Sequence, residues 1–530
     1  MFKENRAQQG SIFDRCANMT ERERRVLENS WAGDFERNIF PFINEGRFEV
    51  LYSNVTGRPN TPVNVVVGAL IIKEMFGYTD EEMVEHVLLD QQVQHALRLT
   101  SAPEIPFSDR TLSRFREALL KYEAETGRDL LKEEVLALSL RAKDILGVND
   151  RVRRMDSMMI PSRCKKIGRL ELVYTCVENL VGVYVELCGA SALPEQLVKY
   201  TNSSNKNATI YRAKPDEASQ RLESAVADAL ALQALCGDRF AGYPAYDLLS
   251  RMLGDQTADG KLIDGKDVKP TSLQNPSDPD ATFRRKAGKG HTGYVANVTE
   301  SFGGGIGIIT GYDLKQNCHS DQEFGKEVIG LTEASSEGGI LISDGAYGSE
   351  ENFDAAEDKN INFVPTCLVG SKPNETLVDF GIEGDSITRC PCGYIPIFAS
   401  YDQGDRILRA TFDASPCAEC ALLGICPAKI RADGFSIVSF TDMAYNRSLF
   451  ARELGSEEYK DFARMRNGVE GVPSVMRRKY GVDSMPVFGI KKSRLFFGLK
   501  VAAANVSVVI NNLRKKRKEK RSLTGGVCLA

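Results

Sequence analysis

The stretch from Ile340 to Ser343 is a short run of strand-forming residues between Gly339 and Gly345, and Asp344 stands at its end. Such a run, bounded by glycines, is typical of a buried central strand. A strand here presents Asp344 at its carboxyl end, where the ligands of open α/β sheets gather. The alternative interpretation is an ordinary Asp-Gly turn, which is among the commonest turn signals.

Two further carboxylates lie in basic settings far from Asp344 along the chain. Asp156 closes a second short extended run that contains three arginines, and Glu470 follows a basic segment near the C-terminus. Three carboxylates in one pocket repel one another unless cations neutralise them, and hard oxygen ligands select magnesium or manganese. If the three residues share a pocket, they are candidate ligands of catalytic metal ions.

The first part of the chain predicts consecutive capped helices. Thr61-Pro62 opens an apolar segment, Thr79 begins a capping box, and a third helix starts at Ser108 with Arg110 and Arg114 near its beginning. Short joints between such helices favour a helix-turn-helix-like module that binds DNA. A plain helical bundle that only packs on the rest of the protein is the alternative.

The segment between Asp156 and Asp344 predicts the rest of an α/β sheet. Residues from about 165 to 260 form a helical insertion, because their apolar positions recur at helical spacing. Two neighbouring strands are expected over 293–299 and 305–310, followed by a helix over 322–334. The glycine run between these strands is no nucleotide-binding loop, because no Gly-Lys-Ser/Thr sequence follows it.

Five cysteines between Asp344 and Glu470 follow the pattern C-x-C and then C-x2-C-x5-C. They are Cys390, Cys392, Cys417, Cys420 and Cys426. Close pairs of thiols approximate a structural zinc site, so we expect four of the five to hold zinc or another thiophilic metal. Such an ion would staple an insertion that is too short to build its own core. Free buried cysteines are the alternative.

The net charge and the local charge clusters give opposite indications about a nucleic-acid partner. A net charge of −4 counts mildly against a nucleic-acid partner. Basic clusters nevertheless adjoin the candidate carboxylates, which favours a channel for a polyanion over the solvated surface that a charge run usually forms.

The same composition indicates a soluble intracellular protein. Hydrophobic residues at 42% and charged residues at 26% are ordinary globular values. No apolar run approaches the roughly 18 residues of a membrane span, and the polar start resembles no signal peptide. The 13 cysteines are expected to be reduced thiols or metal ligands.

Three motifs in this order resemble the DDE transposases of bacterial insertion sequences, in the branch with a cysteine-rich insertion before the final Glu. They are the Asp-Ser at 156, the block from Ser343 to Asn352, and the segment from Arg466 to Gly481 that contains Glu470. The segment 108–116 is similar to part of the N-terminal domain that in these enzymes binds the terminal repeats. The resemblance implies an RNase H-like α/β core in which the strands of Asp156 and Asp344 are adjacent.

The resemblance also implies a reaction. Water releases a DNA 3′-hydroxyl at the element end, and that hydroxyl attacks target DNA, with two magnesium or manganese ions about 4 Å apart at the site. Asp156 and Asp344 would be paired ligands, and Glu470 would hold the second ion. This family usually carries its Glu on a helix, whereas glycine and proline residues, which break helices, surround Glu470 here. Glu458 or Asp461 is therefore an alternative ligand.

We accordingly predict an all-α DNA-binding domain over 1–145 and a catalytic domain over 146–386 and 440–512. A cysteine-rich insertion follows over 387–439, and a basic tail, typically disordered, over 513–530. The candidate DNA contacts are Arg110, Arg114, Arg154, Arg284, Arg285, Arg466 and Arg478.

The expected partners are the terminal inverted repeats of the element and target DNA, bound by a homodimer. The resemblance also implies a protein of the bacterial cytoplasm, associated with the nucleoid. Sequence-specific binding is expected to survive in residues 1–145 alone. A catalytically inactive relative, or a nuclease that cuts without joining, is the alternative function.

Overall fold

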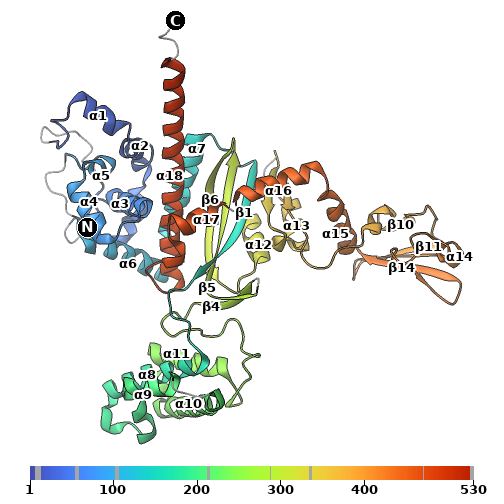
Figure 1. Ribbon diagram of the computed structural model, residues 1–530, viewed down its shortest axis with the longest axis horizontal. Helices are drawn as coiled ribbons and strands as arrows, with labels where there is room; N and C mark the ends of the chain where they lie inside the picture. The colour runs from blue at the N-terminus through green and yellow to red at the C-terminus, as the bar shows by residue number, and fades with distance from the viewer. Residues whose placement is uncertain are drawn as a thin grey trace.

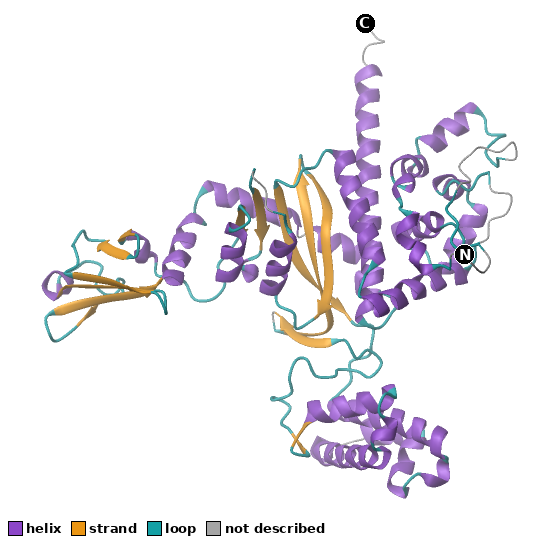
Figure 2. Cartoon of the chain, turned by 180° about the vertical axis from the view of Figure 1, so that it is seen from behind, coloured by secondary structure: helices purple, strands orange, loops and turns teal. Residues whose placement is uncertain are grey.

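The computed structural model describes residues 1–5, 14–53, 59–101, 107–211, 215–286, 288–333, 337–469 and 471–525. Glu470 lies outside the described residues. The helical N-terminal region lies on one side of the central sheet and the small β module on the other, while the helical insertion lies below the sheet in Figure 1 (Figures 1 and 2). The predicted mixed α/β class with a helical N-terminal region is thereby confirmed.

The N-terminal region consists of helices at the positions that the capping signals predict. α3 begins directly after Pro62, the capping box of α4 joins Thr79 and Glu82, and Ser108 caps α6. The helices are α1 (Glu21–Glu28), α2 (Trp31–Asn38), α3 (Val63–Phe76), α4 (Asp80–Leu89), α5 (Gln91–Ala96), α6 (Asp109–Thr126) and α7 (Leu130–Leu146).

The long C-terminal helix α18 (Ile490–Gly525) lies between the N-terminal helices and the central sheet (Figure 1). α3 is apolar on all sides and therefore needs neighbours all round. α18 is one of them. A single hydrophobic cluster contains Leu70 of α3, Phe497 of α18 and Met158 of the sheet. The N-terminal helices thus share their core with the rest of the chain, and residue 145 does not separate two cores.

The central sheet is mixed. Its order is β4-β5-β1-β7-β8, with β6 also paired to β5. β5 runs antiparallel to its neighbours, while β7 and β8 run parallel to β1. The strands are β1 (Val152–Pro161), β4 (Thr282–Lys286), β5 (Lys289–Gly303), β6 (Ile306–Gln316), β7 (Gly339–Ser343) and β8 (Ile361–Pro365).

Helices cover both faces of the sheet. Met155 of β1 packs with Phe324 of α12 (Asp321–Leu331), and α13 (Glu350–Glu357) lies beside α12. Met158, on the opposite face by strand alternation, belongs to the cluster that contains α18. α16 (Glu457–Val469) packs on β1 and β7, and α17 (Gly471–Arg478) follows it.

The insertion after β1 is a helical unit with its own hydrophobic cluster. It leaves the sheet at the end of β1 and returns before β4, and it lies at one end of the sheet (Figure 1). Its elements are α8 (Arg169–Cys188), α9 (Ser203–Tyr211), α10 (Pro215–Cys236), α11 (Pro244–Gln256), β2 (Thr257–Ala258) and β3 (Lys261–Leu262).

The segment that contains the five cysteines forms a β module far from the N-terminal helices (Figure 1). Leu377, Leu408, Phe412 and Phe440 belong to a small buried cluster. The expectation of an insertion without a core of its own is therefore wrong. The elements are β9 (Gly381–Glu383), β10 (Ser386–Arg389), β11 (Phe398–Asp402), β12 (Ile407–Asp413), α14 (Ala414–Ala418), β13 (Lys429–Ile430) and β14 (Phe435–Thr441), with α15 (Asp442–Glu453) leading back to the core.

The basic C-terminal segment is helical through Gly525, which corrects the expectation of a disordered tail. Arg517 donates hydrogen bonds to both carboxylate oxygens of Asp34 in α2, each at 2.6 Å, and this holds the helix on the N-terminal region. One stretch of this helix, within Ile490–Lys520, is long and apolar enough to cross a membrane, which corrects the expectation that no apolar run approaches that length, but 89% of it is buried inside the protein. Such burial is typical of a core helix.

Candidate active site

Asp156, in the middle of β1, and Asp344, just after the end of β7, lie side by side. β1 continues to Pro161, which corrects the expectation that Asp156 closes its extended run. The two strands are parallel, and Arg154 is the register partner of Ile342. Two residues farther along each strand, Asp156 therefore comes opposite Asp344. The apolar run that predicts a strand ending in Asp344 forms β7, which ends at Ser343. The structure thus brings together two of the three predicted carboxylates.

Arg466 of α16 lies at this carboxylate pair. Its Nη2 atom is 4.0 Å from Asp156 Oδ1 and 3.8 Å from Asp344 Oδ2. The exposed fractions of the side chains are 17% for Arg466, 15% for Asp156 and 35% for Asp344, so the group is open to solvent on the Asp344 side. One guanidinium thus offsets part of the repulsion between two carboxylates.

The protonation of Asp156 reflects this setting. Burial raises the pKa of the Asp156 carboxyl above its ordinary value. Arg466, the backbone N–H of Ser157 and, more weakly, Lys286 lower the pKa in part, whereas Asp344 raises it further. The ionised form of a carboxyl in this setting is stabilised by any additional cation beside it.

Neighbouring polar side chains hold the strand ends in place. Ser157 donates a hydrogen bond to Asp321 of α12 at 2.8 Å, and the buried Tyr347 donates to Asn297 of β5 at 2.6 Å. Asp321, Asn297 and Tyr347 were not among the predicted site residues. Tyr347 stands in the block that carries the resemblance, but no sequence signal links Asn297 or Asp321 to this site.

Cys367 was also missed by sequence reasoning. Its thiol donates to Asp344 Oδ1 at 3.3 Å, and burial raises its pKa, with Asp344 adding to the effect. The chain passes so close that a Cβ atom on Gly345 would lie 2.1 Å from the Cys367 carbonyl oxygen. The signal available in the sequence was its position just after a strand, β8, that neighbours β7.

The third predicted carboxylate, Glu470, lies outside the described residues. Arg466 precedes it by four positions and reaches the carboxylate pair. The alternatives Glu458 and Asp461 lie earlier on α16 and are exposed, and Asp461 pairs with Arg464. Neither alternative has a recorded contact with the Asp156 and Asp344 pair within the described residues.

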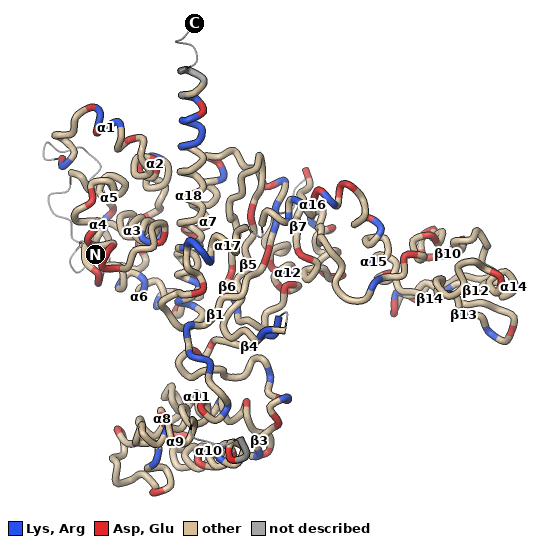
Figure 3. The backbone as a smooth tube through the Cα atoms, in the orientation of Figure 1, with Lys and Arg blue, Asp and Glu red and all other residues tan. Residues whose placement is uncertain are grey.

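The predicted DNA contacts differ in their exposure. Arg110 and Arg114 of α6 and Arg285 of the β4–β5 hairpin are exposed, as is Arg478 of α17. Arg284 is partly buried and donates to the carbonyl of His319 at 3.1 Å. Basic residues gather at β4 near the end of the sheet (Figure 3).

Arg154 is placed differently from the prediction. It is only 5% exposed, and its guanidinium pairs with Glu300 at 2.6 Å and donates to the carbonyl of Met465 at 2.6 Å. A guanidinium with these partners is not available to a phosphate. The prediction that Arg154 contacts DNA is therefore corrected, because its side chain points into the protein.

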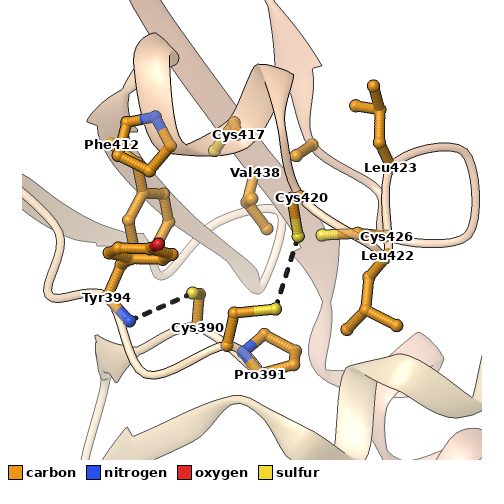
Figure 4. Close-up of a pocket in the computed structure, with 13 residues that line it drawn as sticks. Cys390, Pro391, Tyr394, Phe412, Cys417, Cys420, Leu422, Leu423, Cys426 and Val438 are labelled. Carbon is orange, nitrogen blue, oxygen red and sulfur yellow. Dashed lines mark hydrogen bonds between the residues drawn. The ribbon is translucent and has the colours of Figure 1, made fainter.

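The five cysteines line one pocket of the β module (Figure 4). The sulfurs of Cys392 and Cys420 are 3.3 Å apart, and the backbone N–H of Tyr394 donates to Cys390 Sγ at 3.3 Å. The hydrogen bond with Cys420 raises the pKa of Cys392 to about 11. The pocket therefore gathers all five thiols that the spacing predicts as candidates.

Within the ranges that the structure describes, no group of three or more His, Cys, Asp or Glu side chains is arranged to hold a metal ion. The donor chemistry nevertheless fits the expected ions. Two hard carboxylates already share one cationic group, and sulfurs gather in a single pocket. Hard divalent cations prefer the first kind of site and zinc the second.

Two family models match the chain. The model described as Transposase domain (DUF772) matches residues 24–118, and the model described as Transposase DDE domain matches residues 389–510. The two matches support a DDE transposase of the insertion-sequence type. No curated protein and no solved structure matches it.

The two matched segments contain some of the candidate site residues and leave others out. The N-terminal match spans α1 to most of α6, including Arg110 and Arg114. The C-terminal match spans the five cysteines, Arg466 and Arg478. Asp156 and Asp344 lie between the two matches, so their assignment rests on the strand geometry and on the sequence motifs.

Proposed function

We propose that this transposase cleaves the ends of an insertion sequence and joins the released 3′-hydroxyl to target DNA at Asp156, Asp344 and Glu470. The observation that carries the proposal is that Asp156 and Asp344 lie side by side on neighbouring parallel strands, with Arg466 reaching both. A mixed sheet with one carboxylate on each of two adjacent strands supports an RNase H-like core.

The residues of the site have separate tasks in this proposal. Asp156, Asp344 and Glu470 would hold magnesium or manganese, which when bound polarises the scissile phosphodiester and activates the attacking oxygen. Arg466 would bind a phosphate oxygen, since a guanidinium matches phosphate geometry. Ser157 and Asp321 keep the middle of β1 against α12 through their hydrogen bond.

DNA would reach the site along exposed basic residues. Arg285 and Arg478 are exposed on elements next to the sheet, and Arg110 and Arg114 are exposed on α6 in the matched transposase domain. We assign the first two to phosphate contacts and the second two to the terminal repeats. We also propose that the protein binds DNA as a homodimer and that the cysteine pocket holds a zinc ion. A transposase acts on the DNA of the cell, so we place the protein in the cytoplasm.

The test is cleavage of a linear DNA that carries one element end, whose inverted repeat is read from the DNA flanking the gene. Asp344→Asn should abolish magnesium-dependent cleavage and joining while leaving DNA binding intact, because it removes a ligand charge without removing packing volume. Asp354→Asn, which changes an exposed aspartate of α13, is the matched control.

Three outcomes separate the proposal from its alternatives. Cleavage and joining by the wild type, lost only in Asp344→Asn, support it. Cleavage without joining would identify a nuclease, and binding without cleavage would identify an inactive relative. Wild-type rates in Asp344→Asn would end the assignment of this carboxylate.

A further inference from the structure

Arg154 connects the sheet to the helix that carries Arg466. It stands two residues before Asp156 on β1, so by strand alternation the two side chains are on the same face of the sheet. Its register partner on β5 is Glu300. The guanidinium Nε donates to Glu300 Oε2, and Nη1 donates to the carbonyl oxygen of Met465 in α16, both at 2.6 Å.

The surroundings of Arg154 restrict it to this position. Its guanidinium carbon lies 4.1 Å from the ring centroid of Phe302, and the side chains of Arg154 and Glu300 are each only 7% exposed. α16 approaches so closely that a Cβ atom on Gly468 would lie 2.4 Å from Arg154 Nη1. Glycine at 468 therefore permits the contact between helix and guanidinium.

The residue that follows Met465 is Arg466, which reaches both Asp156 and Asp344. We propose that Arg154 is a positioning residue, which fixes α16 on β1 through the Met465 carbonyl and so places Arg466 at the carboxylate pair. Arg154 itself touches neither carboxylate in any recorded contact among the described residues. The inference rests on the proposed function, because it assigns Arg154 a part in the same reaction.

A buried ion pair also stabilises a fold, so the test must separate the two roles. Removing one partner leaves an unpaired buried charge, whereas replacing both by apolar residues of similar size is often neutral for stability. The double variant Arg154→Met, Glu300→Leu therefore removes the link to Met465 without leaving a buried charge. The matched control is Lys500→Met with Glu74→Leu, a similarly buried pair between α18 and α3. Lys73, which also pairs with Glu74, keeps Asp80 as a partner at 3.5 Å.

The experiment measures melting temperature, amide hydrogen exchange over residues 465–469, DNA affinity and cleavage rate at saturating DNA. We expect the Arg154 and Glu300 double variant to melt near the wild type, to exchange faster in α16 and to bind DNA normally. Its cleavage should fall on the order of 100-fold, which is the effect expected of a misplaced site. The Lys500 and Glu74 control should keep its cleavage rate.

A folded double variant that cleaves at the wild-type rate, or that leaves exchange in α16 unchanged, would overturn the inference. If the double variant does not fold, the variant Gly468→Ala tests the inference instead. Alanine favours helix over glycine, so helix stability should not fall. The added methyl group should nevertheless displace Arg154, and slower cleavage without a lower melting temperature would support the inference. Unchanged cleavage would refute it.

The exchange measurement keeps this inference distinct from the proposed function. It reports on the contact between α16 and β1 without any reaction. If wild-type protein shows no magnesium-dependent cleavage, the proposed function fails, while exchange still reports whether Arg154 holds α16.

Discussion

Lys500 of α18 donates a hydrogen bond to Glu74 of α3 with 2.6 Å between Nζ and Oε2, although the residues are 426 positions apart. Both side chains are less than a tenth exposed. Lys73 also pairs with Glu74, at 3.2 Å. The N-terminal helices therefore complete both their charge pairing and their apolar core with the last helix of the chain.

This relationship predicts that residues 1–147 alone do not fold cooperatively, in contrast to the expectation from the sequence that such a fragment binds DNA by itself. Without α18, the apolar helix α3 loses cover on one side. Fusing residues 488–525 to the fragment should restore a cooperative thermal transition, measured by circular dichroism. A cooperative transition in the unfused fragment would contradict the prediction.

A second prediction concerns Asp156 and pH in metal-free protein. Burial raises the folded-state pKa of Asp156, so its contribution to stability is full below the unfolded pKa, near 3.8, and is lost as pH rises through the folded pKa. Asp156→Asn stays neutral and avoids this loss. We therefore expect the variant to be more stable than the wild type at pH 7, with a difference that disappears toward pH 4.

Urea unfolding with a chelator present measures this difference, and each unit of pKa elevation corresponds to about 1.4 kcal/mol. Asp354→Asn controls for the loss of one exposed carboxylate. Adding magnesium should stabilise the wild type and not Asp156→Asn. A wild type more stable than the variant at pH 7 in chelator would show that ionised Asp156 is favoured without metal.

The third prediction is that the purified protein carries about one zinc, or another thiophilic metal, per chain in the cysteine pocket. Removing it with a chelator, or making Cys417→Ser with Cys420→Ser, should lower the melting temperature of the β module. Cys188→Ser, which changes an exposed cysteine of the helical insertion, is the control. Metal-free protein with undiminished stability in the double variant would leave free cysteines as the explanation.

The fourth prediction addresses recognition of the element ends. Arg110 is exposed at the start of α6, where recognition helices usually contact bases. In the full chain, Arg110→Ala should cost about 1 to 3 kcal/mol of binding on the cognate end and much less on random DNA. Lys121→Ala, at an exposed position farther along α6, should cost little. An equal loss on both DNAs would make Arg110 a phosphate contact.

Local signals in the sequence predicted the elements that position the candidate site. Capping residues such as Thr79 and Ser108 place helix starts, because a cap satisfies backbone groups within a few residues of itself. The glycine-bounded run before Asp344 predicts β7, because strand preference also depends on neighbouring residue types. The close spacing of the cysteines likewise anticipates a shared pocket.

Long-range contacts were beyond such signals. Arginines in similar basic clusters lie in different settings: Arg154 is buried against Glu300, whereas Arg285 is exposed. The charge pattern treats them alike, because it does not contain strand register. The docking of Arg517 on Asp34 was hidden for a similar reason, since a basic tail and a docked basic helix have the same composition.

The sequence by itself determined the transposase resemblance, the starts of several helices and the strand before Asp344, because these depend on residue type and short spacing. The adjacency of the strands of Asp156 and Asp344 was implied by the resemblance alone. Only the tertiary structure decided that Arg466 reaches both Asp156 and Asp344, that Arg154 holds α16, and that α18 completes the N-terminal core. Each of these contacts joins residues more than a hundred positions apart, so it depends on packing between elements and leaves no local pattern.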